Sequence, residues 1–500
     1  MKFIFSLRTR QADERYAMVR SWTLDKEGQL YAALLSASLY ESFYDQPAAE
    51  LAELRKMLRY SDPLFISRMA VHFREQLGFR DLSFILAAEL SAISGDRELV
   101  AGLTARVIQH AGEIPHWLDH YERVHDSHGR HLRVSGAMRK HLAVHFNRLD
   151  TYRFVRLTRV QQARLRHALS VVRPKAEGKV QQTLFRRIRQ DKLPARNAWQ
   201  SEYEALRLQH FDSREIRQTV LKDKWKEGIS TFRIGYGALL NNLPELLSAG
   251  VSGKVLKLAA EYLGNAAAVA GSKQSPLRLV EAYRELQQVQ QGGAVTLREA
   301  LELAVLHSAR EISAREVTGS DEHENVVIAM DISPSMRQPV REGSLVKRFD
   351  IAPLIAMLLK SRGVNVTAGV IGNTWKHIAL PVYPVLGELD LLNRRAGEVG
   401  YAIHGHLVIL DLLRKREIVD KVMIFTDCQL WDQRAFNQLE DADLGRIWKQ
   451  YRQLAPDAKL YLFDLAGYGK PRMERLEDGV YRLAGWSDRV FKVLEALEVI

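Results

Sequence analysis

The sequence changes its apolar pattern near residue 314, and this change divides the chain into two kinds of fold. Up to about residue 312, apolar side chains recur at helical spacing in one segment after another, and strand signals are nearly absent. After the polar stretch 314–324, continuous apolar runs of strand length alternate with helical segments. The pattern predicts a helical domain over 1–313, a linker at 314–324 and an α/β domain over 325–500.

Local signals in the first domain favour short helices joined by tight turns. Ser61, Asp62 and Pro63 combine a capping side chain with a proline suited to a first helical turn, and Gly78 is placed to end that helix. Asp81 is expected to cap the next helix, and 239–248 is expected to pair with 253–262. Such antiparallel pairs stack into HEAT-like helical-repeat arrays, in which each pair buries its apolar face on its neighbours.

The second domain reads as a doubly wound α/β fold. Strands are expected at 326–330, 364–371, 422–425 and 460–465, and helices at 347–361, 405–416, 441–453 and 487–498. Continuous apolar strands separated by helices indicate a parallel sheet that is covered on both faces. Ligands of such sheets bind at the carboxyl ends of the strands.

Positive charge is concentrated in one stretch of the first domain. The chain has a net charge of +12, and residues 133–196 hold 17 Lys and Arg residues against three acidic ones. A solvated surface usually mixes both signs, whereas one sign at this density suits a polyanion such as a phosphate backbone. Nucleic acid is therefore the first expected partner, and an acidic protein is the second. The candidate RNA-binding residues are Arg133, Arg139, Lys140, Arg164, Arg166, Arg173, Lys175, Lys179, Arg186, Arg187 and Arg189.

Aromatic residues and histidines near this stretch leave alternatives open. Tyr152, Phe154, Phe185 and Trp199 could stack on bases, although such aromatics more often belong to a core. The histidines are expected in a solvated or RNA-facing loop, with zinc binding by His116 and His120 as the weaker alternative. They are His116, His120, His125, His128 and His131.

Several classes of protein are disfavoured. The single cysteine, Cys428, excludes intramolecular disulfides and thiolate zinc sites, in line with a reducing compartment. The longest apolar run, 351–359, is far too short to span a bilayer, and the N-terminus lacks the apolar core of a secretion signal, so we expect a cytoplasmic protein. Carboxylates are scattered rather than paired as two-metal nucleases require, and no catalytic residue is predicted.

The first strand of the second domain leads into a loop of oxygen-bearing side chains. Asp331, Ser333 and Ser335 form a D-x-S-x-S pattern there, and Asp427 follows the strand 422–425. Parallel strands bring these side chains to one edge, and hard oxygen ligands suit Mg²⁺ or Mn²⁺. The alternative is a loop whose Ser and Asp side chains only bind backbone groups.

This loop resembles the metal-ion-dependent adhesion site of von Willebrand factor A domains. In that family the D-x-S-x-S loop, a Thr and a further Asp hold one divalent cation, and an acidic group of a partner completes its coordination. Asp331, Ser333, Ser335 and Asp427 match this set, but Ile403 lies where the Thr is expected. His404 or His406 is the candidate substitute.

A helical array followed by such a domain resembles the Ro autoantigen (TROVE domain) family. Segments 61–89, 172–175 and 238–243 are each similar to stretches of that family. The resemblance implies a ring of helices closed by the A domain, with Y-like small noncoding RNA on its outer surface and single-stranded ends of misfolded RNA in its hole. It further implies RNA quality control or processing with an exoribonuclease such as polynucleotide phosphorylase, by a monomeric, non-catalytic protein.

Two other functions remain open at this point. The chain could be a metal-dependent protein-binding scaffold that does not engage RNA. It could also be a nuclease acting through Asp331 and Asp427, although the lack of further acidic residues disfavours this.

Overall fold

The computed structural model describes most of both predicted regions. The residues that it describes are 26–37, 48–127, 134–151, 154, 157, 159–193, 199–312, 324–340, 343–395, 397–400, 403–427, 441–466, 474–475 and 479–484. They form a helical region followed by an α/β region, so the predicted fold class is confirmed.

The helical region runs from α1 to α18 without a strand among its described residues. Its helices are α1 (Lys26–Ala37), α2 (Ala48–Arg59), α3 (Pro63–Glu75), α4 (Arg80–Ile93), α5 (Arg97–Val107), the short 3-10 helix η2 (Ala111–Glu113), α6 (Ile114–Ser127), α7 (Gly136–Asn147), α9 (Arg159–Val172), α10 (Lys179–Arg189), α11 (Trp199–Leu208), α12 (Arg214–Ser230), α13 (Tyr236–Leu240), α14 (Leu243–Ser248), α15 (Gly253–Leu263), α16 (Ala266–Ser272), α17 (Pro276–Gln287) and α18 (Ala294–Ile312).

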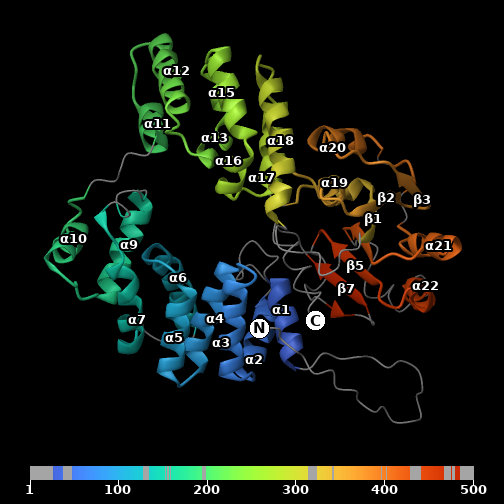
Figure 1. Ribbon diagram of the computed structural model, residues 1–500, viewed down its shortest axis with the longest axis horizontal. Coiled ribbons are helices and arrows are strands. Elements are labelled where there is room, and N and C mark those ends of the chain that lie inside the picture. The colour runs from blue at the N-terminus through green and yellow to red at the C-terminus, as the bar shows by residue number, and fades with distance from the viewer. Residues whose placement is uncertain are drawn as a thin grey trace.

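These helices pack on close neighbours along the chain and together follow a curve. α3 contacts α4, α4 contacts α6, α5 contacts α7, and α18 contacts both α15 and α17. Figure 1 shows the helices from α1 to α18 following one another around this curve, with the α/β region between its two ends. The arrangement corresponds to the expected ring of helices closed by the second region.

Two of the predicted helix boundaries differ from the structure. Asp62 caps α3 as expected, since its side chain accepts a hydrogen bond from the Leu64 N–H at 3.2 Å, and Gly78 follows with a φ of 65°. However, α4 begins at Arg80, with Asp81 in its first turn rather than at its cap. The predicted helix 239–248 is broken into α13 and α14 because Pro244 lies in the first turn of α14 and starts a new helix.

The α/β region is built on one seven-stranded sheet in the order β3-β2-β1-β4-β5-β7-β6. The pairs β2–β1, β1–β4, β4–β5 and β5–β7 are parallel, and the two edge strands β3 and β6 are antiparallel to their neighbours. The strands are β1 (Asn325–Asp331), β2 (Asn365–Ile371), β3 (Trp375–Ile378), β4 (Lys421–Thr426), β5 (Lys459–Asp464), β6 (Glu474–Arg475) and β7 (Val480–Ala484). The helical elements are η3 (Pro334–Arg337), α19 (Arg348–Lys360), α20 (Leu386–Asn393), α21 (His406–Lys415) and α22 (Asp441–Leu454).

Both faces of the sheet are covered, as the continuous apolar strands predicted. Alternate residues of β1 enter different cores: Val326 and Ile328 join a core that continues into the helical region, and Val327 joins the core under α21 and α22. α19 contributes a nearly fully buried apolar stretch, Ile351–Leu358, to the first of these cores. The helix predicted at 487–498 lies outside the described residues, and the linker 314–324 does so except for Glu324.

Buried charges join the two regions. Glu302 of α18 accepts hydrogen bonds from the backbone N–H groups of Val385 and Leu386, both at 2.8 Å, and of Gly387 at 2.7 Å, at the start of α20. Arg284 of α17 pairs with Asp350 of α19 at 2.9 Å and with Asp390 of α20. A carboxylate at a helix N-terminus satisfies N–H groups that have no partner within the helix. The contact between the helical region and the α/β region is therefore formed by specific charged hydrogen bonds as well as by apolar packing.

Among the described helices, none combines the length and the apolar character needed to cross a lipid bilayer.

Candidate nucleic-acid interface and strand-edge site

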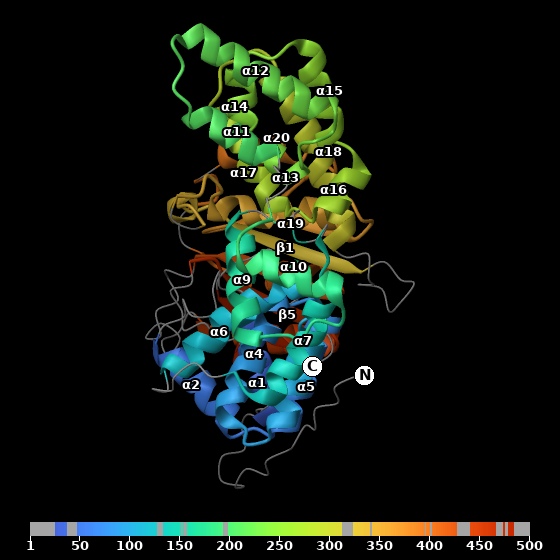
Figure 2. The same cartoon turned by 90° about the vertical axis from the view of Figure 1, so that its left-hand side faces the viewer.

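The basic stretch of the sequence forms helices α7, α9 and α10 on the outside of the curve. α9 contacts both α7 and α10, so the three helices form one continuous surface. Figure 2 shows this surface facing the viewer, and Figure 1 shows α10 at the outer edge of the molecule. α10 is anchored by Leu184, Phe185 and Ile188 on its buried face, and this leaves its arginines on the opposite face.

Most of the predicted RNA-binding residues lie on this surface with exposed side chains. Arg139 and Arg166 are half-buried, and Arg133 lies outside the described residues. The exposed members are Lys140, Arg164, Arg173, Lys175, Lys179, Arg186, Arg187 and Arg189. The side chains that the sequence predicted to act together are therefore on connected helices.

Acidic side chains compensate only two of these cations. Arg164 pairs with Asp119 at 3.7 Å, and Arg166 pairs with Asp191 at 2.6 Å. Within the described part of the chain, the other eight form no ion pair with Asp or Glu: Arg139, Lys140, Arg173, Lys175, Lys179, Arg186, Arg187 and Arg189. We call these eight residues the basic surface. Its charge is available to an external anion.

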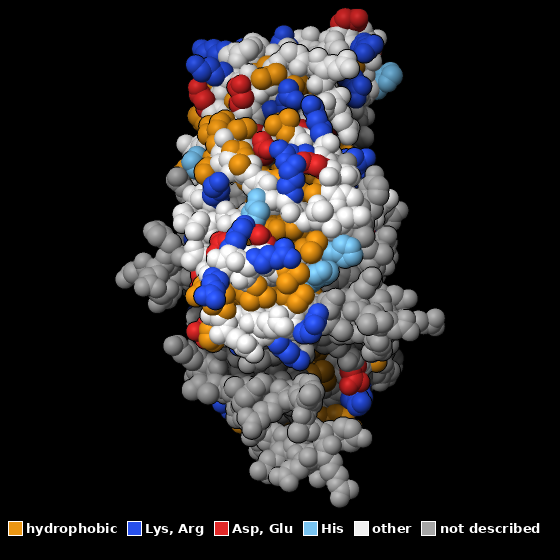
Figure 3. All heavy atoms as spheres, turned by 90° about the vertical axis from the view of Figure 1, so that its right-hand side faces the viewer, with side chains coloured by type: hydrophobic (Ala, Val, Ile, Leu, Met, Phe, Trp, Pro, Cys, Tyr) orange, Lys and Arg blue, Asp and Glu red, His pale blue; other side chains and the backbone are white. Residues whose placement is uncertain are grey.

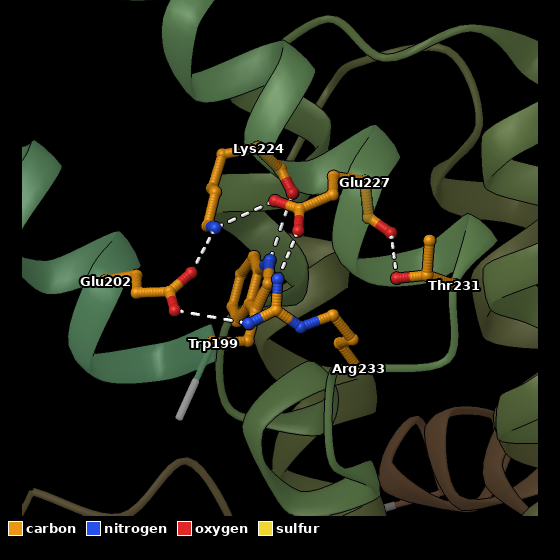
Figure 4. A network of polar contacts seen from close by, with 6 residues as sticks. All are labelled: Trp199, Glu202, Lys224, Glu227, Thr231 and Arg233. Carbon is orange, nitrogen blue, oxygen red and sulfur yellow. Dashed lines mark hydrogen bonds and ion pairs between the residues drawn. The ribbon is translucent and has the colours of Figure 1, made fainter. Parts of the chain in front are cut away.

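Some cations elsewhere in the helical region form ion pairs, as the contact between α11 and α12 illustrates (Figure 4). Lys224 pairs with Glu202 and, at 2.8 Å, with Glu227. Arg233 pairs with the same two carboxylates. Two cations and two carboxylates thus form a closed network that holds α11 against α12, which is a structural role for charge.

The face of the molecule opposite α10 also has compensated charge. Figure 3 shows Lys and Arg side chains there dispersed among acidic, histidine and hydrophobic ones. Lys415 pairs with Asp411 of the same helix, α21, at 2.7 Å, and Lys376 of β3 pairs with Glu398. These ion pairs compensate part of the charge of that face, whereas the eight cations of the basic surface form no ion pair within the described residues.

The aromatic residues near the basic surface belong to the core. Phe154, Phe185 and Trp199 are 1%, 2% and 2% exposed, respectively. Trp199 stacks on Tyr203, with ring centroids 5.0 Å apart, and donates to the Lys224 carbonyl at 3.0 Å. These three side chains cannot stack on bases in this conformation. Tyr152 lies outside the described residues.

Three of the five histidines are described, and they differ in exposure and partners. His116 is exposed, His120 is half-buried with a pKa lowered by burial, and the buried His125 hydrogen-bonds to Ser91 at 3.0 Å. His128 and His131 lie outside the described residues. Over the described ranges, no three His, Cys, Asp or Glu side chains are grouped to hold a metal ion.

The predicted site in the α/β region lies at the carboxyl ends of β1 and β4, which pair in parallel. Asp331 is 1% exposed, and its Oδ1 accepts from the Ser333 N–H at 2.7 Å while its Oδ2 accepts from the Thr426 hydroxyl at 2.9 Å. The hydroxyls of Ser333 and Ser335 hydrogen-bond to each other at 3.0 Å. Burial raises the pKa of Asp331 to about 6, against the effect of these hydrogen bonds.

A second predicted carboxylate of this edge, Asp427, faces an arginine. Asp427 is 1% exposed, and among the described residues neither of its oxygens has a hydrogen-bond partner. The Arg348 Nη1 lies 3.7 Å from the Asp427 Oδ2. Ile403, at the position expected for a Thr ligand, packs against the apolar core under α21 and α22. His404 and His406 contact each other, with ring centroids 5.5 Å apart.

Sequence reasoning placed Asp331 and Asp427 at one edge but missed two of their partners. Thr426 could have been found, because it ends β4 beside β1 in a parallel pair. Arg348 could not, because it lies 17 positions beyond Asp331 and no local pattern connects the two. It is placed by the contact between Pro339 and Lys347 and by the Arg348 N–H, which donates to the Gln338 carbonyl at 3.0 Å.

Comparisons with known proteins agree with this architecture. Residues 208–320 match the family model of the TROVE domain. A search of curated proteins finds no match. Among solved structures, the chain is similar to the crystal structure of the Deinococcus radiodurans RO (RSR) protein, with a TM-score of 0.66 and 15% sequence identity, over 94% of this chain and 99% of that chain. At this identity the structural likeness concerns the fold. Residues 208–320 are therefore similar to the TROVE domain, and the chain as a whole is similar in fold to the RO (RSR) protein.

Proposed function

We propose that the protein is a non-catalytic RNA-binding protein that holds structured RNA against the basic surface, which lies on α7, on α10 and in the connection between α9 and α10. The observation that carries the proposal is the set of eight basic side chains without acidic partners, on connected helices at the outer edge of the molecule. Arg187 and Arg189 can donate forked hydrogen bonds to phosphate oxygens. The TROVE match supports RNA as the polyanion and supports a protein that does not act as an enzyme.

The finer parts of the proposal come from the family resemblance. The structured RNA would be a small noncoding RNA of the Y type, and single-stranded ends of misfolded RNA would bind within the ring of helices. An exoribonuclease such as polynucleotide phosphorylase would then process the bound RNA. The protein would act in the cytoplasm as a monomer.

Crosslinking of bound RNA tests the proposal on the full chain. The purified protein is irradiated with RNA that copurifies with it, and the crosslinked peptides and RNA are sequenced. We expect crosslinks in α7, α9 and α10 and few in α20 and α21. Crosslinks confined to the α/β region, or no retained RNA, would refute the proposed surface.

Metal-dependent protein binding is the rival function, and one substitution separates it from RNA binding. Asp331→Ala removes a carboxylate that a bridging cation would require, but it lies in the α/β region, away from the basic surface. Unchanged RNA affinity with this variant is expected here. Loss of a copurifying protein, together with no RNA in either preparation, would favour the scaffold.

A further inference from the structure

We propose that the guanidinium of Arg348 supplies the positive charge of the strand-edge site, in place of a divalent cation. The inference goes beyond RNA binding and concerns residues that the RNA-binding proposal does not use. It follows from three features of the site: the surroundings of Asp427, the bonds already made by the D-x-S-x-S loop, and the side chain at position 403.

Asp427 requires a positive charge close by. Its side chain is 1% exposed, and neither oxygen accepts a hydrogen bond from the part of the chain that the structure describes. An ionised carboxylate in such surroundings is costly unless a cation compensates it. The Arg348 Nη1 lies 3.7 Å from the carboxylate, and the Arg348 side chain is only 12% exposed. Arginine stays charged at any ordinary pH, so this compensation is permanent.

The other predicted oxygen ligands, Asp331, Ser333 and Ser335, already make hydrogen bonds within the site. Both oxygens of Asp331 accept hydrogen bonds, from the Ser333 N–H and the Thr426 hydroxyl. The hydroxyls of Ser333 and Ser335 bond to each other. Each of these oxygens keeps a lone pair beyond the bond that it makes, so the bonds do not by themselves exclude a cation, but Mg²⁺ would need six oxygen ligands at about 2.1 Å in near-octahedral geometry.

Position 403 offers no ligand. Ile403 packs into the apolar core under α21 and α22, so a direct oxygen ligand is missing from the side of the site where the resemblance to A domains expects one. Two of the predicted ligands, Asp331 and Asp427, would then be charged, and Asp427 already faces a guanidinium. Like charge repels like charge, and Arg348 therefore disfavours a cation beside Asp427. The residues present do not fit a tight Mg²⁺ or Mn²⁺ site.

The ion pair also has a consequence for docking. In a metal-dependent site an acidic group of a partner coordinates the exposed side of the cation. Here the positive charge is a side chain of the protein itself, held at the first turn of α19. The strand edge is thus a fixed structural ion pair, and attachment of a partner through a shared metal is not available to it.

Titration of the full-length protein with Mn²⁺, followed by the paramagnetic signal of free Mn²⁺, tests the proposal. We expect no bound Mn²⁺ in the wild type at 1 mM total metal. The variant Arg348→Gln/Ile403→Thr is expected to gain one site, with at least tenfold tighter binding than the wild type, and Asp331→Ala in that background removes it. Arg337→Gln/Ile403→Thr is the matched control, because Arg337 is an exposed arginine of the same loop.

Two outcomes of the titration would overturn the proposal. One is Mn²⁺ bound stoichiometrically by the wild type and lost in Asp331→Ala. The other is a folded Arg348→Gln/Ile403→Thr variant that binds no better than its Arg337 control, because the guanidinium would then not be what excludes the ion.

A stability cycle tests the ion pair without any metal and covers the case in which the double variant does not fold. Arg348→Met, Asp427→Asn and their combination are compared by urea unfolding in EDTA. If the effects of the two single variants on the unfolding free energy were additive, they would predict a certain unfolding equilibrium constant for the double variant. The measured constant is expected to be at least tenfold smaller than this value, that is, the double variant is more stable. Additive effects would contradict a direct interaction between the two charges.

Discussion

Neutralising the arginines of α10 is expected to weaken RNA binding in a way that depends strongly on salt. Arg186, Arg187 and Arg189 are exposed and belong to the eight uncompensated cations, and the anchoring residues of α10 are Leu184, Phe185 and Ile188. Arg186→Gln/Arg187→Gln/Arg189→Gln should therefore leave the helix folded while removing three positive charges. Thermal unfolding of the variant checks this first condition.

The size of the effect follows from counterion release. Each phosphate contact contributes about 0.7 to 0.9 to the slope of log K against log salt, so three lost contacts reduce the slope by about 2 to 3. In 0.1 M salt the affinity should fall about 100- to 500-fold, and in 0.3 M salt the deficit should shrink to about 10- to 25-fold. Fluorescence anisotropy with one labelled structured RNA, over this range of salt, measures both quantities.

A control with equal loss of charge separates a local surface from the net charge of the protein. Arg337, Arg414 and Arg416 are exposed residues of the α/β region, and Gln at all three lowers the net charge by the same amount. Only a small change in affinity is expected. Equal losses for both triple variants would mean that no specific surface holds the RNA, and an unchanged affinity for the α10 variant would remove that helix from the interface.

Three further predictions concern stability. Arg284→Met should cost about 3 to 5 kcal/mol of the unfolding free energy, because Asp350, which is 0% exposed, loses its cation; the same loss with an additional Asp350→Asn would argue against the pair. Glu302→Gln should cost about 1 to 3 kcal/mol and separate the calorimetric unfolding of the two regions, since an amide has a single oxygen for the three N–H groups of α20. The pKa values of His72, His120 and His145 are lowered by burial, so the folded state favours their neutral forms. The contribution of these neutral histidines to the unfolding free energy is fully present above pH 6.5. It is lost as the pH falls below that value, because the unfolded chain then binds more protons than the folded one. Relative to a His72→Gln/His120→Gln/His145→Gln variant, wild-type stability should fall between pH 7 and pH 5, and a difference independent of pH would contradict this assignment.

Local signals in the sequence predicted the elements whose boundaries depend on neighbouring residues. Asp62 and Pro63 start α3 as expected, and the apolar runs of β1, β2, β4 and β5 form the parallel centre of the sheet. The edge strand β3 was not predicted, because two of its four residues are exposed and it lacks a continuous apolar run. The division of 239–248 at Pro244 was available from the sequence and was missed.

The candidate sites could be predicted only where their residues are close together in the sequence. A dense run of arginines implies a charged surface, but whether acids neutralise it depends on contacts such as the one between Arg166 and Asp191, which are 25 positions apart. The burial of Trp199 likewise depends on packing against Trp225 of another helix. Arg348 reaches Asp427 through folding of the whole sheet edge. Interactions of this kind have no local pattern.

The salt dependence of RNA binding by the wild-type protein tests the central claim most directly. Eight cations of α7, α10 and the connection between α9 and α10 form no ion pair within the described residues. If they hold the RNA backbone, log K should fall against log salt with a slope between about −3, for four engaged cations, and about −7, for all eight. A slope near zero, or affinity for RNA no greater than for a neutral polymer, would contradict the account.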